Sequence, residues 1–525
     1  MKRSFIGFMV SLSVVILLIP FNAQAASATA PAIEAAKSPG IAAHPQPGGI
    51  YKVLIRNRAN AFGYPPRISG SDRDYAPPFF DRLLSIGDDG QYQPGLALIW
   101  DASADGKTIT FRLRQGVTFH DGTPFNAQAV KANIDNLIPP KATILTGVAS
   151  VDVVDDTTVK LNLPAYNNLI LYHFAVNAAT WIYSPEAVKK NGEDWATTHP
   201  VGTGPFMLKD LQPNISMKLV KNPNYWQKGL PYLDGMEIAS VPDPMTQIVT
   251  LKAGQANAIY DAQKAAIQLR EQGYVLHSAT GSFAGINFDS KNSPYFSKRQ
   301  VREAIEHAID KEAICSGPGE GLFEPAYQIR TKTHPDYNPA CALRKYDPAK
   351  AKKLLAEAGY PNGFGFKVFV KDDGWRDGWV AIQSYLAAVG IKMDIEYINT
   401  AAFNLIRVAG KIEKGGAAWL THPNPTNTLF TLDTYYRSTS PSYAYVVKPA
   451  GIDKLIDQAK LTRDPAAVTK LNQQILKLLH DDVTMVPLWE QSRFVVVDKS
   501  VQNTGWFIYG DPDNNQMGHR TWLKK

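Results

Sequence analysis

Alternating apolar and polar residues predict several half-buried strands in the first part of the chain. Residues 50–55 are also predicted to form a strand, which leads toward a Gly-Tyr-Pro-Pro turn at residues 63–66. The same alternation appears over residues 109–119 and residues 159–163. Because successive side chains of a strand point to opposite faces, this spacing is typical of strands that bury one face.

A helical spacing takes over in the second part of the chain. Apolar side chains recur at every third or fourth position over residues 301–309, which predicts a helix with one buried face. Asp347 and Asp464 are each followed by a proline and a further apolar stripe, and this pair is a common helix start. Strand-like alternation over residues 393–397 lies between these helices. Strands interleaved with helices predict an α/β fold.

The first 25 residues have the layout of a secretory signal peptide. Basic residues at positions 2 and 3 precede an apolar run over residues 10–19 and an Ala-Gln-Ala pattern at residues 23–25. The run is too short to cross a bilayer, which needs about 20 apolar residues. We predict cleavage after Ala25 and a periplasmic protein, since no nearby cysteine could accept a lipid anchor. A signal anchor is the alternative.

The size and charge of the mature chain point to a multidomain protein without a nucleic-acid footprint. About 500 mature residues exceed what one core serves, so two or three domains are expected. Cleavage would leave 53 basic and 48 acidic residues, a net charge of +5, and the basic residues are spread along the chain. Residues 26–49 are rich in alanine and proline and are expected to be a disordered leader.

Cys315 and Cys341 are the two cysteines of the chain. Export would place both in an oxidising compartment, where such a pair can close a loop. We therefore predict a structural disulfide across a stretch rich in glycine and proline. A reactive thiol is the alternative.

The signatures of a secreted hydrolase, the rival class, are absent from the sequence. There is no Gly-x-Ser-x-Gly elbow, no His-Glu-x-x-His motif and no phosphate loop. The ten histidines show no metal-ligand spacing, and the glycines at positions 317, 319 and 321 are expected to form a turn rather than a dinucleotide site. We expect no catalytic site, no cofactor and no bound metal.

Several motifs together resemble one family of transport proteins. The longest covers residues 94–125 and includes Phe119-His120-Asp121-Gly122-Thr123-Pro124-Phe125. Others are Gly-Thr-Gly-Pro-Phe at residues 202–206, Asn-Pro-Asn-Tyr-Trp at 222–226, and further matches at 287–310, 346–360 and 486–488. They resemble the peptide/opine/nickel family of ABC-importer solute-binding proteins, family 5, over nearly the whole mature chain. In this motif His120 is part of the fold.

The resemblance implies a type II periplasmic binding protein: two α/β lobes joined by two crossing strands, with an extra subdomain on the first lobe. The crossings would lie around residues 283–288 and 487–496. Lobe I would comprise residues 50–72, 201–282 and 491–525, the extra subdomain residues 73–200, and lobe II residues 283–490. It also implies a monomer that delivers a small-molecule solute to an ABC permease with ATPase subunits.

The family pattern places the ligand-binding residues on loops at strand ends and near the crossings. These residues are Asn57, Arg58, Gly281, Ser282, Phe283, Trp375, Arg376, Trp419, Thr421, His422, Asn424, Asn427, Trp489 and Glu490. Each also has a structural interpretation: Trp375 and Trp419 would fill the core, the arginines would be solvated, and Trp489 and Glu490 would brace the hinge.

The segment over residues 419–427 carries the most information about the ligand. The resemblance implies aspartates here in dipeptide binders, one of which pairs with the peptide ammonium. This chain has His422, Asn424 and Asn427 instead, and the nearest carboxylate is Asp433. An unpaired buried ammonium would cost several kcal/mol, so free-amine peptides are disfavoured. Neutral donors with arginines favour an anionic solute, such as an opine or a sugar-phosphate conjugate.

Other ligand classes and functions remain open. A peptide or a metal chelate, with His422 as a ligand, would suit the same family. An export-compartment chaperone and a secreted hydrolase are the alternatives of another class.

Overall fold

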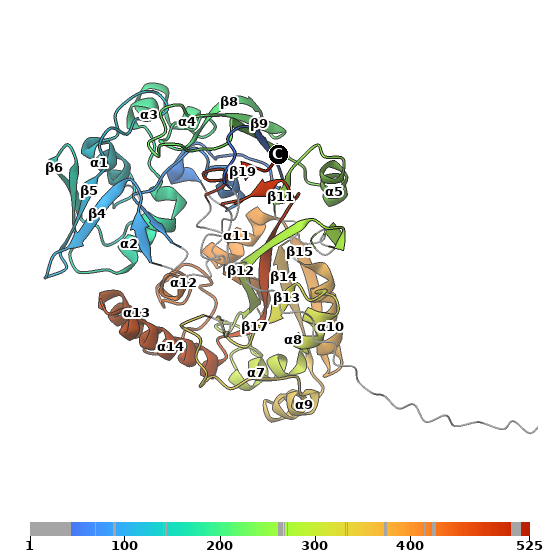
Figure 1. Cartoon of the computed structure of the whole chain (residues 1–525). Coiled ribbons are helices and arrows are strands. Elements are labelled where there is room, and N and C mark those ends of the chain that lie inside the picture. The colour runs from blue at the N-terminus through green and yellow to red at the C-terminus, as the bar shows by residue number, and fades with distance from the viewer. Residues whose placement is uncertain are drawn as a thin grey trace, which may run out of the picture. The chain divides into compact units, whose positions relative to one another are not determined.

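One large mixed sheet runs through the part of the chain that the computed structural model describes (Figure 1). Described are residues 44–525 without 69, 88–90, 140, 142–143, 261–265, 267, 270, 331, 333, 372–374, 411, 414, 423–426 and 506–515. The strand order is β15-β14-β16-β12-β17-β11-β1-β10-β9-β8, and β13 pairs with β17. The strands are β1 (Ile50–Ile55), β8 (Phe206–Gln212), β9 (Ser216–Lys221), β10 (Gly235–Ser240), β11 (Ala258–Tyr260), β12 (Val275–Phe288), β13 (Phe323–Pro325), β14 (Phe364–Lys371), β15 (Ile391–Ile398), β16 (Ala417–His422) and β17 (Met485–Val497).

Two long strands, β12 and β17, belong to both halves of this sheet. They pair antiparallel from Val275 opposite Val497 to Asn287 opposite Met485. The last part of β12 also pairs with β16 in one half, and the last part of β17 pairs with β11 in the other. We call the half with β14, β15 and β16 lobe II and the half with β1, β8, β9, β10 and β11 lobe I. The predicted crossing strands are therefore confirmed.

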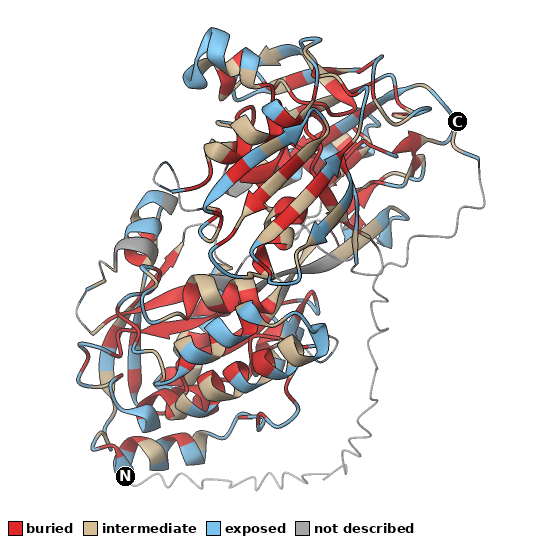
Figure 2. Ribbon diagram, turned by 90° about the vertical axis from the view of Figure 1, so that its left-hand side faces the viewer, coloured by how far each residue is buried: buried red, intermediate tan, exposed pale blue. Residues whose placement is uncertain are grey.

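Helices cover the large sheet, and their outer faces are exposed (Figure 2). The predicted helix starts are confirmed, because Asp347 accepts a hydrogen bond from the amide of Lys350 and Asp464 accepts one from Ala467. The helices are α5 (Pro244–Lys252), α7 (Arg299–Ala308), α8 (Lys311–Ser316), α9 (Pro348–Glu357), α10 (Arg376–Ala387), α11 (Thr400–Ala409), α12 (Thr428–Tyr435), α13 (Ile452–Leu461) and α14 (Pro465–Asp482).

A second sheet, with strand order β4-β5-β7-β6, forms its own core with α1 and α2. We call this part the small-sheet unit. Its elements are β4 (Ala97–Ala102), β5 (Thr108–Leu113), α1 (Ala127–Asp135), β6 (Ser150–Asp155), β7 (Thr158–Asn162) and α2 (Leu169–Val176). Among the described residues, the remaining strands and α-helices are β2 (Leu84–Ile86), β3 (Tyr92–Pro94), α3 (Pro185–Asn191), α4 (Glu193–Ala196), β18 (Val501–Gln502) and β19 (Trp522–Leu523). The domain boundaries given above stay a prediction.

The motif residues of lobe I meet at one buried carboxylate. Asp81 accepts hydrogen bonds from the Thr203 hydroxyl at 2.8 Å, the Tyr225 hydroxyl at 3.1 Å and the Trp226 indole at 2.8 Å. Burial raises the pKa of Asp81 to about 6. Nearby, the His120 ring lies 3.0 Å from the Gly204 carbonyl through Nε2. These contacts thus tie the motif loops of lobe I to Asp81 and His120 of the predicted extra subdomain, and His120 serves the fold, as expected.

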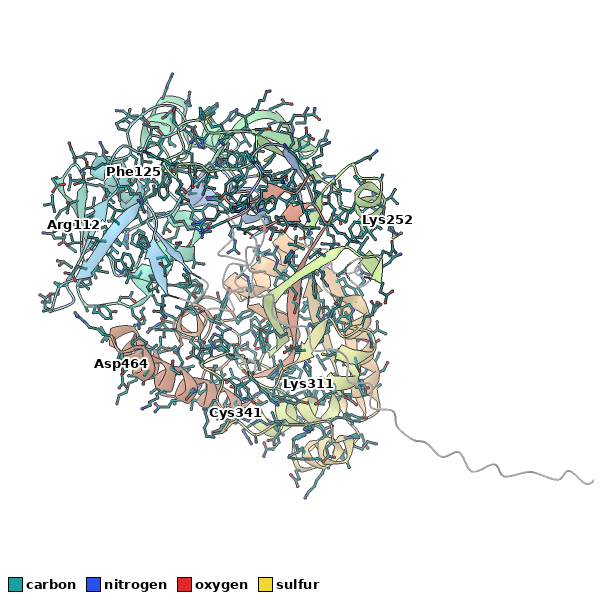
Figure 3. The ribbon with its side chains drawn as sticks, in the orientation of Figure 1. Arg112, Phe125, Lys252, Lys311, Cys341 and Asp464 are labelled. Carbon is teal, nitrogen blue, oxygen red and sulfur yellow. The ribbon has the colours of Figure 1, made fainter. Side chains whose placement is uncertain are left out.

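The two cysteines do not form the predicted disulfide: both are buried free thiols. Cys315 lies in α8 and packs in the main core, whereas Cys341 lies beside the end of α14, near Lys477 and Asp481 (Figure 3). The two thiols therefore have different surroundings. Burial raises the pKa of Cys315 to about 12 and that of Cys341 to about 11.

The predicted signal peptide and most of the predicted leader lie outside the described residues. Residues 35–525 form one unit by their internal contacts. Within the described part of that unit, no helix combines the length and the apolar character that a membrane crossing requires.

Candidate ligand-binding site

Most of the predicted lobe II residues lie where β14 and β16 end and β12 crosses. Strand register places Phe283 of β12 opposite His422 of β16 on one side and opposite Glu490 of β17 on the other. Trp375 and Arg376 follow β14, which runs parallel to β16. The carboxyl ends of parallel strands are where ligands bind in α/β sheets. The structure therefore brings these residues to one edge of lobe II.

The predicted lobe I residues, Asn57 and Arg58, follow β1. The carbonyl of Asn57 accepts hydrogen bonds from the hydroxyls of Tyr75 and Ser240, the latter at 3.1 Å. Arg58 is exposed. The backbone at Asn57 is thus held firmly, while the convergence of Arg58 with lobe II stays a prediction.

The tryptophans of the predicted site form aromatic clusters near the crossing strands. The Trp375 ring lies edge to face with Trp489, with centroids 5.0 Å apart, and 4.6 Å from the Phe323 ring. Trp489 is only 2% exposed and Trp419 only 8%. Trp489 and Trp419 are therefore buried, whereas Trp375 is half-buried, and the role of each in binding stays a prediction.

Among the remaining predicted residues, Arg376 and Asn427 have side chains with defined contacts. Arg376 is exposed, and its guanidinium lies 4.1 Å from the Tyr397 ring centroid. The Asn427 side chain caps α12 by accepting a hydrogen bond from the Phe430 amide at 2.8 Å. Gly281, Ser282, Thr421 and His422 are described by their backbone, and Asn424 lies outside the described residues.

Glu490 has a perturbed carboxyl group. It lies opposite Phe283 and, on β13, opposite Glu324. Burial raises the pKa of Glu490 to about 7, and the nearby Arg330 works against this rise. A carboxyl group that titrates near neutral pH thus lies on the return crossing strand.

Arg330 is a candidate that the sequence did not reveal. It is 5% exposed, and its Nε donates to the Thr428 hydroxyl at 2.8 Å while Nη2 donates to the Thr431 hydroxyl at 3.3 Å. Burial lowers its pKa, and Asp336 and Glu490 oppose this effect. Both threonines lie on α12, which begins directly after the 419–427 segment. No local motif marks Arg330, because only tertiary packing brings it to α12.

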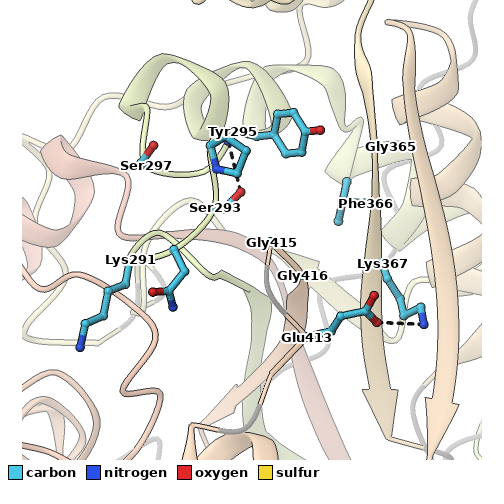
Figure 4. Close-up of a pocket in the computed structure, with 12 residues that line it drawn as sticks. Lys291, Ser293, Tyr295, Ser297, Gly365, Phe366, Lys367, Glu413, Gly415 and Gly416 are labelled. Carbon is cyan, nitrogen blue, oxygen red and sulfur yellow. Dashed lines mark hydrogen bonds and ion pairs between the residues drawn. The ribbon is translucent and has the colours of Figure 1, made fainter.

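A cavity of about 700 Å³ lies at the opposite end of lobe II (Figure 4). It is lined at the beginning of β14 by Gly365, Phe366 and Lys367, and before β16 by Glu413, Gly415 and Gly416. Lys367 pairs with Glu413 across it at 3.0 Å. Because the predicted cleft is at the carboxyl ends of these strands, this cavity is a separate feature. Among the described residues, no cluster of three or more His, Cys, Asp or Glu side chains could hold a metal.

Comparisons with known proteins agree with this architecture. The model of the family described as bacterial extracellular solute-binding proteins, family 5 Middle, matches residues 91–442. The glutathione-binding proteins GsiB of Shigella boydii and Salmonella typhimurium are each 30% identical over 465 residues, which cover 83% of this chain and 87% of theirs.

Solved structures show the same fold. AgaA of A. tumefaciens R10, in complex with agropinic acid, has a TM-score of 0.78 and 26% identity, and the match covers 91% of this chain and 99% of AgaA. DppA of Helicobacter pylori, in complex with the peptide STSA, has a TM-score of 0.79 and 23% identity over the same shares of the two chains. The type II periplasmic-binding-protein fold is thus confirmed, and this chain belongs to family 5 of the bacterial extracellular solute-binding proteins.

Proposed function

We propose that this chain is the periplasmic binding protein of an ABC importer, and that it captures a small polar solute of net negative charge. Opines and sugar-phosphate conjugates meet this description. The glutathione-binding relatives add glutathione, which carries two carboxylates and one ammonium. The AgaA complex with agropinic acid supports the opine class.

The observation that carries this proposal is the buried guanidinium of Arg330 next to the helix that follows the 419–427 segment. Burial penalises its charge, Asp336 and Glu490 offset part of that penalty, and an anionic group of the solute would add to their effect. Guanidinium groups match carboxylates and phosphates through paired hydrogen bonds. The Thr428 hydroxyl, which Arg330 holds, would add a neutral donor.

Free-amine peptides fit this region less well. Asp433, the first carboxylate after the 419–427 segment, already pairs with Arg437 at 2.8 Å and Lys460 at 2.9 Å, and Glu413, which lies equally close before the segment, pairs with Lys367 at 3.0 Å. Glu490 is a carboxyl group on the return crossing strand, and Glu324 of β13 lies opposite it. A solute with one ammonium and a surplus of carboxylates therefore suits Arg330 and Glu490 together.

Closure of the two lobes is the mechanism that we propose for capture. Contacts of the solute with both lobes would add to the contacts between the lobes and so favour the closed form over the open one. The chain performs no chemistry on the solute in this proposal, and the closed form would be the one that the permease receives.

Calorimetry and thermal unfolding of the mature chain test the ligand class. The probes are reduced glutathione, agropinic acid, glucose 6-phosphate and the dipeptide Ala-Ala. We expect saturable binding and a raised Tm with at least one anionic probe, since a ligand at 100 times its Kd stabilises by about 2.7 kcal/mol. Binding of Ala-Ala with no response to the three anionic probes would contradict the proposal.

A matched pair of variants assigns the effect to Arg330. Arg330→Lys keeps the charge but loses the planar fork, so we expect at least tenfold weaker binding of the anionic probe. Arg299→Lys changes a partly exposed arginine that pairs with Glu303 at 3.1 Å within lobe II, and should leave binding unchanged. Mass spectrometry of the recovered probe distinguishes a binding protein, which returns it intact, from a hydrolase.

A further inference from the structure

The small-sheet unit touches lobe II through a set of polar contacts that the crossing strands do not provide. Asn168 precedes α2 and donates its side-chain amide to the carbonyls of Ala459 at 2.8 Å and Thr462 at 3.1 Å. Its backbone amide donates to the Lys460 carbonyl at 3.0 Å. These carbonyls lie at the end of α13, where the last helical carbonyls have few local partners, although the Ala459 carbonyl also accepts from the Thr462 amide at 3.2 Å.

Arg463, the residue after Thr462, makes a contact in the opposite direction, from lobe II to the small-sheet unit. Its Nη2 donates to the carbonyls of Ser103 at 2.8 Å and Ala104 at 3.1 Å, in the turn between β4 and β5. Its guanidinium also lies 4.9 Å from the Tyr166 ring centroid. Gly106 leaves room for the Arg463 side chain, because a Cβ at position 106 would lie 2.8 Å from Nη2 of Arg463. The φ of Gly106 is +71°, which also favours glycine at this position. We call Asn168, Arg463 and the carbonyls that they bind the interlobe clasp.

Apolar contacts adjoin the clasp. The Phe430 ring of α12 lies 5.5 Å from the Tyr172 ring and 5.6 Å from the His173 ring of α2. Leu169 of α2 is 2% exposed and packs in the core formed by α12, α13 and α14. The small-sheet unit thus buries part of α2 against lobe II.

The clasp lies apart from the crossing strands. Figure 1 places α2, α12 and α13 to the left of β12 and β17, and the hydrogen bonds of Asn168 place α2 directly against α13. A rotation of the lobes about β12 and β17 would therefore separate the clasp atoms.

We propose that the interlobe clasp is a closure contact that bounds the ligand cleft on the side away from the crossing strands, and so restricts the solute to one small enough to be enclosed. This inference rests on the proposed function, because it names the size class of the solute. Long peptides would have to break the clasp in order to lie in the cleft.

The clasp is tested first without any solute, by small-angle X-ray scattering and hydrogen exchange on the mature chain. We expect Arg463→Ala and Asn168→Ala to increase the radius of gyration and to speed exchange at residues 459–463 at least tenfold. Arg299→Ala is the matched control, because Arg299 donates to the Asp481 carbonyl at 2.6 Å within lobe II. Arg463→Lys keeps the charge. Its radius of gyration and its exchange rate should therefore lie between those of Arg463→Ala and those of the unmodified chain.

A second experiment measures size selection with reduced glutathione and a nonapeptide as probes. We expect the unmodified chain to bind glutathione and reject the nonapeptide, and Arg463→Ala to lose about tenfold in affinity for glutathione.

The outcomes separate the clasp from the proposed function. Scattering and exchange of Arg463→Ala that match those of Arg299→Ala would overturn the closure contact, as would nonapeptide binding by the unmodified chain. An opened Arg463→Ala variant in a chain that binds no anionic probe would leave the closure contact standing and refute the proposed function instead.

Discussion

The guanidinium of Arg493 on β17 lies 3.2 Å from the carboxylate of Asp74, which precedes it by 419 residues. Asp74 is buried, so removal of the arginine leaves a poorly solvated carboxylate. We expect Arg493→Ala to lower the free energy of unfolding by about 3 kcal/mol, as is typical when one partner of a buried pair is removed. Urea unfolding measures this loss. The double variant Asp74→Ala/Arg493→Ala should recover part of it, and no recovery would show that the two groups are not coupled.

The raised pKa of Glu490 predicts a specific pH dependence of stability. The pKa rises from 4.5 to about 7 on folding, so the folded chain binds this proton more tightly than the unfolded chain. Stability therefore falls as pH rises from about 4.5 to about 7. Glu490→Gln removes this fall, and above pH 7 the variant should be more stable by at most about 3 kcal/mol. Thermal unfolding from pH 4 to pH 8 tests this, and a constant difference across the range would contradict it.

The sequence predicted the fold well, because its elements have local signals. Helix α7 follows from the apolar stripe over residues 301–309, and the starts of α9 and α14 follow from Asp347 and Asp464. The crossing strands followed from the family resemblance, and the register of β12 with β17 confirms them. Each of these features depends on neighbours in sequence or on a long motif.

No local sequence pattern predicts the contacts around the candidate site. Arg330 reaches Thr428 across 98 residues, and Asn168 reaches Ala459 across 291 residues. The prediction for Cys315 and Cys341 failed because two cysteines in one chain do not establish that their thiols meet. Trp489 was predicted both as a ligand contact and as a hinge brace; it is buried on β17, and its role stays a prediction.

A buried ion network in lobe II predicts a strong stability effect. Glu306 is fully buried and binds Lys311 at 3.0 Å and Arg344 at 3.2 Å. Glu306→Ala leaves two buried cations without this carboxylate. We therefore expect the free energy of unfolding, measured with urea, to fall by about 3–5 kcal/mol. The control is Glu357→Ala, which breaks an exposed pair with Lys353 at 3.9 Å and should cost less than about 0.5 kcal/mol. Equal effects of the two changes would show that burial does not set the strength of the network.

Free, buried thiols predict a different chemistry from a disulfide. Because burial raises the pKa values of Cys315 and Cys341, little thiolate forms at neutral pH, and a thiol reagent should react slowly with the folded chain. The reagent should titrate two thiols after denaturation without a reductant. A structural disulfide would instead give no free thiol, and its removal would lower the free energy of unfolding by about 2–5 kcal/mol.

The stability of the cysteine variants separates the same two possibilities. We expect Cys341→Ala to lower the free energy of unfolding by about 1 kcal/mol, since it removes only a small buried side chain. A loss of several kcal/mol in this variant, matched by Cys315→Ala, would favour the disulfide.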